Sequence, residues 1–168
     1  KTQTIKILGF NDFHGQLSAP PAIEGRALGG AALLASYFRA AANGNEQSTL
    51  VVHAGDLIGA SPPASALFQD EPTVEFLGAA LGSGCSRSTR GSDLCHVVSS
   101  LGNHEFDEGL SELRRMVTGG NHARGPFLGH DYEGTPFEYI GANVRDKKTA
   151  EPVVSPHVVK TLAGVKVG

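Results

Sequence analysis

The sequence lacks several features that would indicate particular classes of protein. None of its 168 residues is tryptophan, and its single methionine lies inside the chain. No apolar run approaches the length of a membrane-spanning helix. The 14 lysines and arginines nearly balance the 17 aspartates and glutamates, and both signs are dispersed. These absences argue against a membrane span and against a surface that binds nucleic acid.

Cysteine is scarce as well, because Cys85 and Cys95 are the only two in the chain. They flank the polar segment 86–94, and such a pair favours one disulfide that closes a surface loop. Two free thiols are the alternative, and a zinc site is disfavoured because the spacing matches no known cluster. A disulfide indicates an oxidising compartment, so we expect a periplasmic or extracellular protein. Neither an initiator methionine nor a signal-like apolar segment is present, which predicts that Lys1 begins a processed or trimmed chain.

The remaining composition favours one globular domain, because 40% of the residues are hydrophobic and 22 glycines indicate many tight turns. Apolar, β-branched segments alternate with alanine- and leucine-rich ones, which predicts an α/β fold with largely parallel central strands. Two prolines in 61–64 predict a break in regular structure. The predicted strands cover 4–10, 49–54, 96–101 and 137–144, with a hairpin at 157–162 and 165–167. The predicted helices cover 28–42, 72–81 and 108–117.

Residues able to bind metal follow three of the predicted strands. Asp12 and His14 come after the first strand, two residues apart, so their side chains share a face if the segment is extended. Asp56 follows the second strand, and Asn103 and His104 follow the third. Because the carboxyl ends of parallel strands lie side by side, we expect these five residues to converge.

Carboxylate, imidazole and amide-oxygen ligands suit a pair of divalent ions such as Mn²⁺, Zn²⁺ or iron, and the sequence does not choose among them. Asp56 follows the middle strand and is predicted to bridge the two ions. Two ions about 3.5–4 Å apart form a clamp that phosphoryl hydrolysis uses. Each motif alone has a simpler explanation: Asp12 or Asp56 as a turn former, His14 as a surface residue, Asp107 as a helix cap.

The other histidines carry no such pattern. His53 lies within a predicted strand, so we expect it to be a packed side chain and not a ligand. No role is assigned to the rest, which are His96, His122, His130 and His157.

Together these motifs resemble those of the calcineurin-like metallophosphoesterases: Asp-x-His at 12–14, Gly-Asp at 55–56 and Gly-Asn-His-Glu at 102–105. The segments 11–15 and 102–107 are similar to the 5′-nucleotidase branch, which also contains UDP-sugar hydrolases and 2′,3′-cyclic-nucleotide phosphodiesterases. Gly-Ala-Asn-Val at 141–144 and the final hairpin resemble that branch too, so the likeness covers nearly the whole chain. It implies the N-terminal half of an α/β-β-α sandwich.

The resemblance also implies a role for each matching residue. Asp12 and His14 would hold one metal ion, Asn103 would hold the other, and Asp56 would bridge them. Asn103 and His104 would contact the substrate phosphate, and His104 would stabilise the transition state. Asp107 would orient the imidazole and favour its charged form, which suits a developing negative charge.

One departure from the family concerns the second half of the metallophosphoesterase domain. Family members carry further histidines there, in Gly-His and Gly-His-x-His motifs, and a C-terminal domain whose aromatic residues stack on the nucleobase. Gly129-His130-Asp131 lacks the second histidine, and no Gly-His-x-His occurs. We therefore expect residues 1–168 to be the N-terminal part of a single metallophosphoesterase domain. Its partner would be the remainder of the same enzyme.

The resemblance predicts a hydrolase of nucleoside 5′-monophosphates, a small-molecule substrate. A 2′,3′-cyclic-nucleotide phosphodiesterase or a UDP-sugar hydrolase would use the same pair of metal ions, so the motifs do not separate these activities. A non-catalytic binding module that keeps the fold is the alternative from another class. For the isolated chain, the missing ligands predict weak metal binding and negligible turnover.

Overall fold

A four-stranded parallel sheet forms the centre of the computed structural model, which describes residues 2–19, 21–26, 29–80 and 84–168. The strands lie in the order β1-β2-β3-β4, so each strand pairs with its neighbour in the chain. Their bounds are β1 Lys6–Phe10, β2 Thr49–His53, β3 Val97–Ser100 and β4 Glu138–Ile140. Parallel pairing brings the ends of β1, β2 and β3 to one edge, as the sequence predicts.

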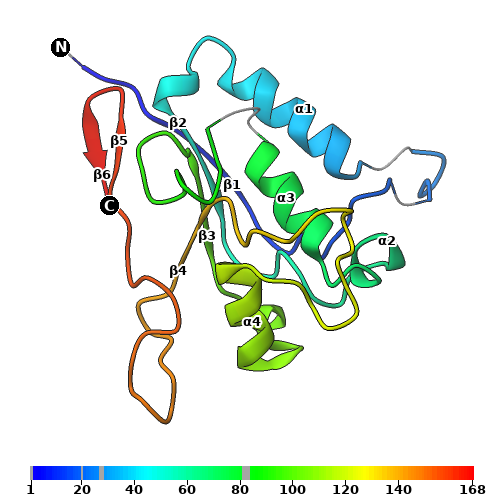
Figure 1. Ribbon diagram of the computed structural model, residues 1–168. Coiled ribbons are helices and arrows are strands. Elements are labelled where there is room, and N and C mark those ends of the chain that lie inside the picture. The colour runs from blue at the N-terminus through cyan, green and yellow to red at the C-terminus, as the bar shows by residue number, and fades with distance from the viewer. Residues whose placement is uncertain (1, 20, 27–28, 81–83) are drawn as a thin grey trace.

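Helices cover one face of this sheet. They are α1 (Ala31–Ala42), α3 (Glu71–Ala79) and α4 (Gly109–Thr118), and the short α2 (Pro63–Ala66) lies next to α3. Figure 1 shows α1 and α3 beside the sheet and α4 near its carboxyl edge. Val51 and Val97 of the sheet, Val74 and Leu77 of α3 and Met116 of α4 share one buried core.

The opposite face of the sheet carries a smaller apolar cluster, built on Leu50, Val98 and Leu162. Leu162 belongs to a hairpin of two antiparallel strands, β5 (Lys160–Leu162) and β6 (Val165–Val167), which Figure 1 shows on this side. The hairpin leaves part of the face open, because Ile7 of β1 remains 60% exposed.

The predicted elements are present, with shifted bounds and one error. The predicted break at 61–64 is wrong in part, because α2 begins at Pro63, where proline is tolerated in a first helical turn. The predicted strands 137–144 and 157–162 shrink to β4 and β5. The helix predicted at 28–42 begins at Ala31; Leu28, like the Leu81 predicted to end α3, lies outside the described residues. Short 3-10 turns at Glu46–Ser48 and His104–Phe106 have no counterpart in the prediction.

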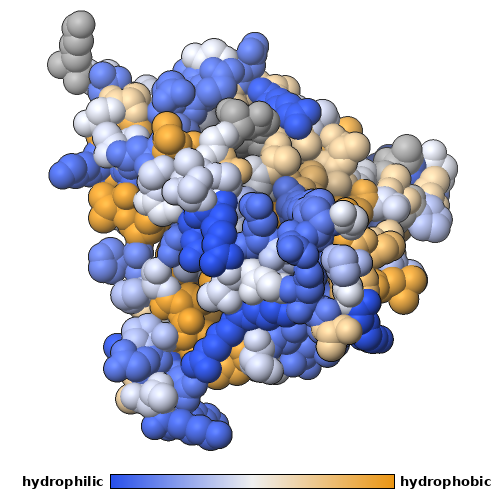
Figure 2. All heavy atoms as spheres, in the orientation of Figure 1, coloured by the Kyte–Doolittle hydropathy of each residue, from blue (hydrophilic) through white to orange (hydrophobic). Residues whose placement is uncertain are grey.

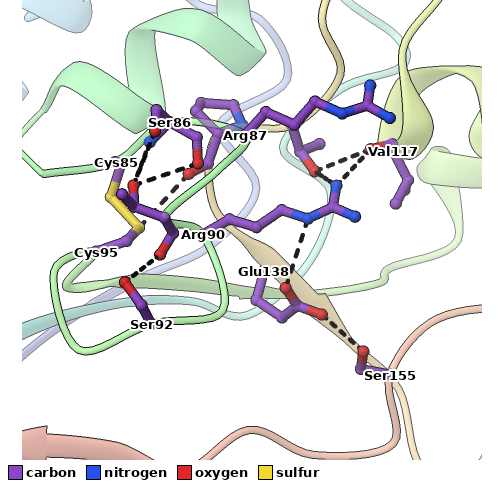
Figure 3. Close-up of polar contacts among 12 residues, drawn as sticks. Cys85, Ser86, Arg87, Arg90, Ser92, Cys95, Val117, Glu138 and Ser155 are labelled. Atoms are coloured by element: carbon purple, nitrogen blue, oxygen red, sulfur yellow. Dashed lines mark hydrogen bonds and ion pairs between the residues drawn. A yellow bond between two sulfur atoms is a disulfide. The ribbon is translucent and has the colours of Figure 1, made fainter.

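A disulfide joins Cys85 and Cys95 and closes the loop that leads into β3. Inside this loop Arg90 forms an ion pair with Glu138, Nε to Oε2 3.8 Å, and donates to the carbonyl of Val117 at 2.7 Å (Figure 3). Ser155 in turn donates to Glu138 at 2.6 Å. The loop is therefore held to β4 and to the end of α4 by polar contacts as well as by the disulfide.

The surface in the view of Figure 2 is mixed, with hydrophobic patches over the hairpin β5–β6 and around α2, separated by hydrophilic residues. Leu67, just after α2, is 71% exposed. Across the described ranges, no helix combines the length and the apolar character needed to cross a bilayer.

Candidate metal centre

The loops that follow β1 and β2 are joined to each other by backbone hydrogen bonds. Asp12 N–H donates to Gly55 at 3.1 Å, and His14 N–H donates to the Asp56 carbonyl at 3.0 Å. Gly15 N–H adds a third bond, to Leu57 at 3.0 Å. The pairing of the two strands thus continues beyond the sheet and brings Asp12 and His14 alongside Asp56.

The backbone of these loops is left-handed at Asp12 (φ 53°), His14 (φ 46°) and Asp56 (φ 59°). The extended conformation expected for 12–14 is therefore wrong, and the two side chains meet because the chain turns at each of them. Non-glycine residues in this region cost on the order of 1–2 kcal/mol each. Three such residues within a few ångströms indicate a functional site, where strain is kept by its surroundings.

Two glycines let the second and third loops approach closely. A Cβ placed on Gly55 would lie 2.7 Å from the backbone nitrogen of Gly102. One placed on Gly102 would lie 2.6 Å from the nitrogen of Asp56. Backbone atoms at such distances exclude any side chain at either position, so both glycines are required for Asp56 to reach the third loop.

His14, Asp56 and His104 come together at this edge, with one ligand atom of each within 4.8 Å of the others. The two imidazoles lie edge to face with ring centroids 4.9 Å apart. Asp12 stands beside them, its Oδ1 3.7 Å from Nε2 of His14. The carboxylates of Asp12 and Asp56 and the imidazole of His14 form a donor set that fits a divalent transition-metal ion.

Hydrogen bonds fix the orientation of both histidines. Nδ1 of His14 lies 2.8 Å from the Gly59 carbonyl, which can only accept, so Nδ1 carries the proton and Nε2 is free to bind a metal. Nδ1 of His104 lies 2.7 Å from Oδ2 of Asp107. This hydrogen bond raises the pKa of the His104 imidazole above its ordinary value, with nearby carboxylates adding to the effect.

Asn103 and Asp107, two further residues of the predicted site, flank the 3-10 turn that begins at His104. Asn103 is exposed and precedes the 3-10 turn at His104–Phe106, on the loop that also carries His104. The N-cap of α4 is Glu108, and Asp107 directs its carboxylate to His104. Asp107 is therefore not the N-cap of α4, and its predicted pairing with His104 is present.

Glu105 holds the second and third loops together, a role that the sequence analysis missed. Its side chain is buried, and its carboxylate accepts three backbone N–H groups, from Asp56 at 3.0 Å, Leu57 at 2.8 Å and Gly102 at 2.5 Å. Burial raises the pKa of this carboxyl, and the three donors oppose that effect. Asp56 is positioned further by its Oδ1, which accepts the His104 N–H at 2.9 Å. The Gly-Asn-His-Glu motif contains Glu105 but does not reveal what it bonds.

His53 is buried, as predicted for a packed histidine. Its Nδ1 lies 2.9 Å from the Ser99 hydroxyl, and its ring packs on Phe10 with centroids 4.6 Å apart. Burial lowers the pKa of His53 to about 4, so the ring is neutral at physiological pH.

Comparison with known proteins agrees with this geometry. Residues 5–151 match the family model described as calcineurin-like phosphoesterase. The chain belongs to this family. The resemblance read from the sequence motifs is confirmed.

Among curated relatives, Endonuclease YhcR of Bacillus subtilis is 34% identical over 97% of this chain and 12% of its own length. Cell wall protein Lmo0130 of Listeria monocytogenes is 37% identical over 99% of this chain and 21% of its own length. A shorter match, 33% identical over 40% of this chain, is a 2′,3′-cyclic-nucleotide 2′-phosphodiesterase/3′-nucleotidase of Salmonella typhimurium. The chain thus spans a small part of these relatives.

Among solved structures, the 5′-nucleotidase precursor of Thermus thermophilus matches with a TM-score of 0.64. The match covers 98% of this chain and 27% of that protein, at 21% identity. A likeness at this identity establishes the fold, and it confirms the predicted α/β class with a parallel sheet.

Proposed function

We propose that this chain belongs to a metal-dependent phosphomonoester hydrolase that acts on nucleoside 5′-monophosphates. The observation that carries the proposal is the convergence of His14, Asp56 and His104 at the carboxyl edge of the sheet, their ligand atoms within 4.8 Å of one another. Membership of the calcineurin-like phosphoesterase family supports hydrolysis of a phosphoester. The 5′-nucleotidase-like motifs at 11–15 and 102–107 support the choice of substrate.

Two divalent ions would be held at this edge. Asp12 and His14 would bind one, Asn103 the other, and Asp56 both. Ions in such a pair lower the pKa of a water molecule and neutralise charge on the phosphoryl oxygens. The protein prepares for them by freeing Nε2 of His14 and by fixing Asp56 between the two loops.

His104 would act on the substrate itself, with Asp107 behind it. The Asp107 carboxylate holds the ring through Nδ1 and favours its protonated form, which leaves Nε2–H as a donor. A cationic donor at this place stabilises negative charge that develops on the phosphoryl group. Asn103, on the same loop, would contact the phosphate through its side-chain amide.

A second candidate within the same chemistry is cleavage of 2′,3′-cyclic nucleotides, favoured by the Salmonella relative with that name. UDP-sugar hydrolysis remains the other alternative that shares the metal pair. The relative named an endonuclease raises nucleic acid as a substrate. The composition of this chain, 14 basic against 17 acidic residues, shows no excess of basic residues to support it.

We further propose that residues 1–168 are the N-terminal part of a longer metallophosphoesterase domain. Two ions need more ligands than the described residues bring to this edge, and Ile7 lies exposed on the open face of the sheet. An extracellular or periplasmic location is supported by the disulfide and by the relative named a cell wall protein. The purified 168-residue chain should hydrolyse p-nitrophenyl phosphate negligibly; robust turnover by it would overturn the partial-domain proposal.

The activity is tested on the full-length protein loaded with Mn²⁺ or Zn²⁺. Hydrolysis of AMP is followed as release of phosphate, and that of bis-p-nitrophenyl phosphate as release of p-nitrophenol. Hydrolysis of 2′,3′-cyclic AMP and UDP-glucose is followed by chromatography of the nucleotide product, all at equal enzyme concentration. The proposal expects AMP to have the highest kcat/KM. Preference for bis-p-nitrophenyl phosphate or 2′,3′-cyclic AMP would establish the second candidate instead, and metal binding without any turnover would establish the binding module.

A further inference from the structure

Asp70 lies outside the motifs, at the start of α3, and its side chain does not cap that helix. As the N-cap residue of α3, it would be expected to accept an N–H from the first turn of that helix. It makes no such side-chain bond. Its Oδ2 instead accepts the backbone N–H of Gly59 at 3.1 Å, across a separation of 11 residues.

The carboxylate of Asp70 is itself held rigidly. Its Oδ1 accepts the hydroxyl of Ser65 at 2.5 Å, and that hydroxyl lies 2.5 Å from the Thr73 hydroxyl. Ser65 and Thr73 are both fully buried. Asp70 has a left-handed backbone (φ 57°), as does Gln69 before it (φ 52°). The carboxylate of Asp70 is therefore positioned by two consecutive residues in a strained conformation.

Gly59 connects this arrangement to the candidate metal centre. Its carbonyl accepts the proton on Nδ1 of His14 at 2.8 Å. Its Cα faces the other histidine, because a Cβ built there would lie 2.6 Å from the His104 carbonyl and 2.8 Å from Oδ2 of Asp107. One residue therefore sets the orientation of the His14 ring and packs against the His104–Asp107 pair.

We propose that Asp70 is a positioning residue for the metal centre: by holding the N–H of Gly59, it fixes the carbonyl that keeps the proton of His14 on Nδ1 and its Nε2 free for metal. The inference rests on the proposed function, because it assigns His14 as a ligand. It adds a residue that touches neither metal nor substrate. Partners that orient a ligating histidine typically matter by about 10–100-fold in metal affinity.

The test uses Asp70→Gly in the full-length protein, with Gln69→Gly as its matched control. Glycine suits a left-handed backbone, so each change removes a side chain while relieving strain, and both place equal flexibility beside α3. Only Asp70→Gly removes the bond to Gly59. Asp70→Asn is the conservative variant, since its amide oxygen can still accept that N–H while its amide nitrogen donates to Ser65.

Two readouts are measured. In the metal-free protein, the ¹⁵N shifts of the His14 imidazole report which nitrogen carries the proton. Asp70→Gly should lose the uniform Nδ1–H form that wild type, Gln69→Gly and Asp70→Asn keep. Titration with Co²⁺, followed by its visible absorption, should show affinity about 10–100-fold weaker for Asp70→Gly alone.

The outcomes separate this inference from the proposed function. A folded Asp70→Gly with the wild-type His14 tautomer and Co²⁺ affinity would overturn it, as would equal losses in Gln69→Gly. If Asp70→Gly does not fold, Ser65→Ala, which removes one hydrogen bond to Asp70, should shift both readouts in the same direction, and no shift would overturn the inference. If wild type binds no metal and turns over no phosphoester, the proposed function fails, and the tautomer comparison still decides the role of Asp70.

Discussion

The two ends of the central sheet place charged side chains in opposite surroundings. At the carboxyl edge, Asp12 and His14 are partly exposed and lie on strained backbone. At the amino end of β3, Lys160 is buried, and its ammonium donates to the carbonyls of Arg90 at 2.7 Å and Ser92 at 2.6 Å. At the carboxyl edge, side-chain atoms that could bind a metal ion remain accessible. At the amino end, the ammonium of Lys160 is already hydrogen-bonded to carbonyls of the protein.

This contrast shows that a cluster of charged side chains can bind a ligand only where its polar atoms are not already hydrogen-bonded within the protein. Near Lys160, the carboxylate of Asp93 accepts the backbone N–H of Thr161 at 2.7 Å, and His96 bonds through both ring nitrogens to backbone carbonyls. The contacts of Lys160 and Thr161 join the disulfide loop to the hairpin β5–β6, and those of His96 join it to the carbonyl of Glu46. We therefore expect changes at the carboxyl edge to alter metal binding and turnover, and changes at the amino end to alter stability.

The largest effect should come from removing metal ligation. In the full-length protein, Asp56→Asn replaces the carboxylate proposed to serve both ions with a neutral amide, so metal content should fall together with activity. Chelation of wild type should abolish turnover, and added Mn²⁺ should restore it. Metal analysis and the phosphate-release assay measure both. Full metal content in Asp56→Asn would show that Asp56 is not the bridging ligand.

The next largest effect concerns His104 and Asp107. In the full-length protein, His104→Asn removes a donor used mainly in the transition state, so kcat should fall by about 10²–10³ with little change in KM. Asp107→Asn should lower kcat less, because the imidazole remains, and the double variant should be less than additive. Near wild-type turnover of fully metallated His104→Asn would make His104 a bystander.

At the amino end, the disulfide should affect stability alone. Closing a loop with a sequence separation of 10 residues should stabilise the protein by about 2–3 kcal/mol on the chain-entropy model. Replacing Cys85 and Cys95 together by serine should lower the unfolding free energy by that amount and leave metal affinity unchanged. Denaturant unfolding of both proteins measures it. A loss of metal affinity with the fold intact would contradict the separation of the two ends.

The smallest effect should come from Asp93→Asn. The N–H of Thr161 lowers the pKa of the exposed Asp93 carboxyl below its ordinary value, about 3.9. A lowered pKa contributes stability above about pH 4 that is lost as pH falls through the folded value. Melting temperatures should therefore show a small wild-type advantage at pH 6 that disappears once the pH falls below the lowered pKa of Asp93. An advantage independent of pH would exclude the charge as its source.

Sequence patterns predicted the parallel strands because β-branched, apolar segments such as Val51-Val52 and Val97-Val98 are distinctive. The convergence of the loops that carry His14, Asp56 and His104 was predicted from the parallel topology. The left-handed backbone at Asp12 and His14 could not be predicted, because it arises from hydrogen bonds to the loop after β2. The roles of Asp70 and Glu105 could not be predicted for the same reason. Their carboxylates accept backbone N–H groups, and such contacts leave no pattern in the spacing of side chains along the sequence.

The strands lie in the sheet in the same order as in the chain, and this order has a consequence for how the protein folds during synthesis. Because β1, β2, β3 and β4 neighbour one another in sequence, each strand can add to the growing edge of the sheet as synthesis proceeds. The metal-centre loops are complete at Asp107, whereas the disulfide loop is docked by Lys160, about 70 residues after the carbonyls that it contacts. The pairs of β1 with β2 are also closer in sequence than the contacts that dock Lys160. We therefore expect amides at the ends of β1 and β2 to gain protection before those of the hairpin in pulse-labelled hydrogen exchange during refolding. The carboxyl edge would then take shape while the opposite end of the sheet is still open.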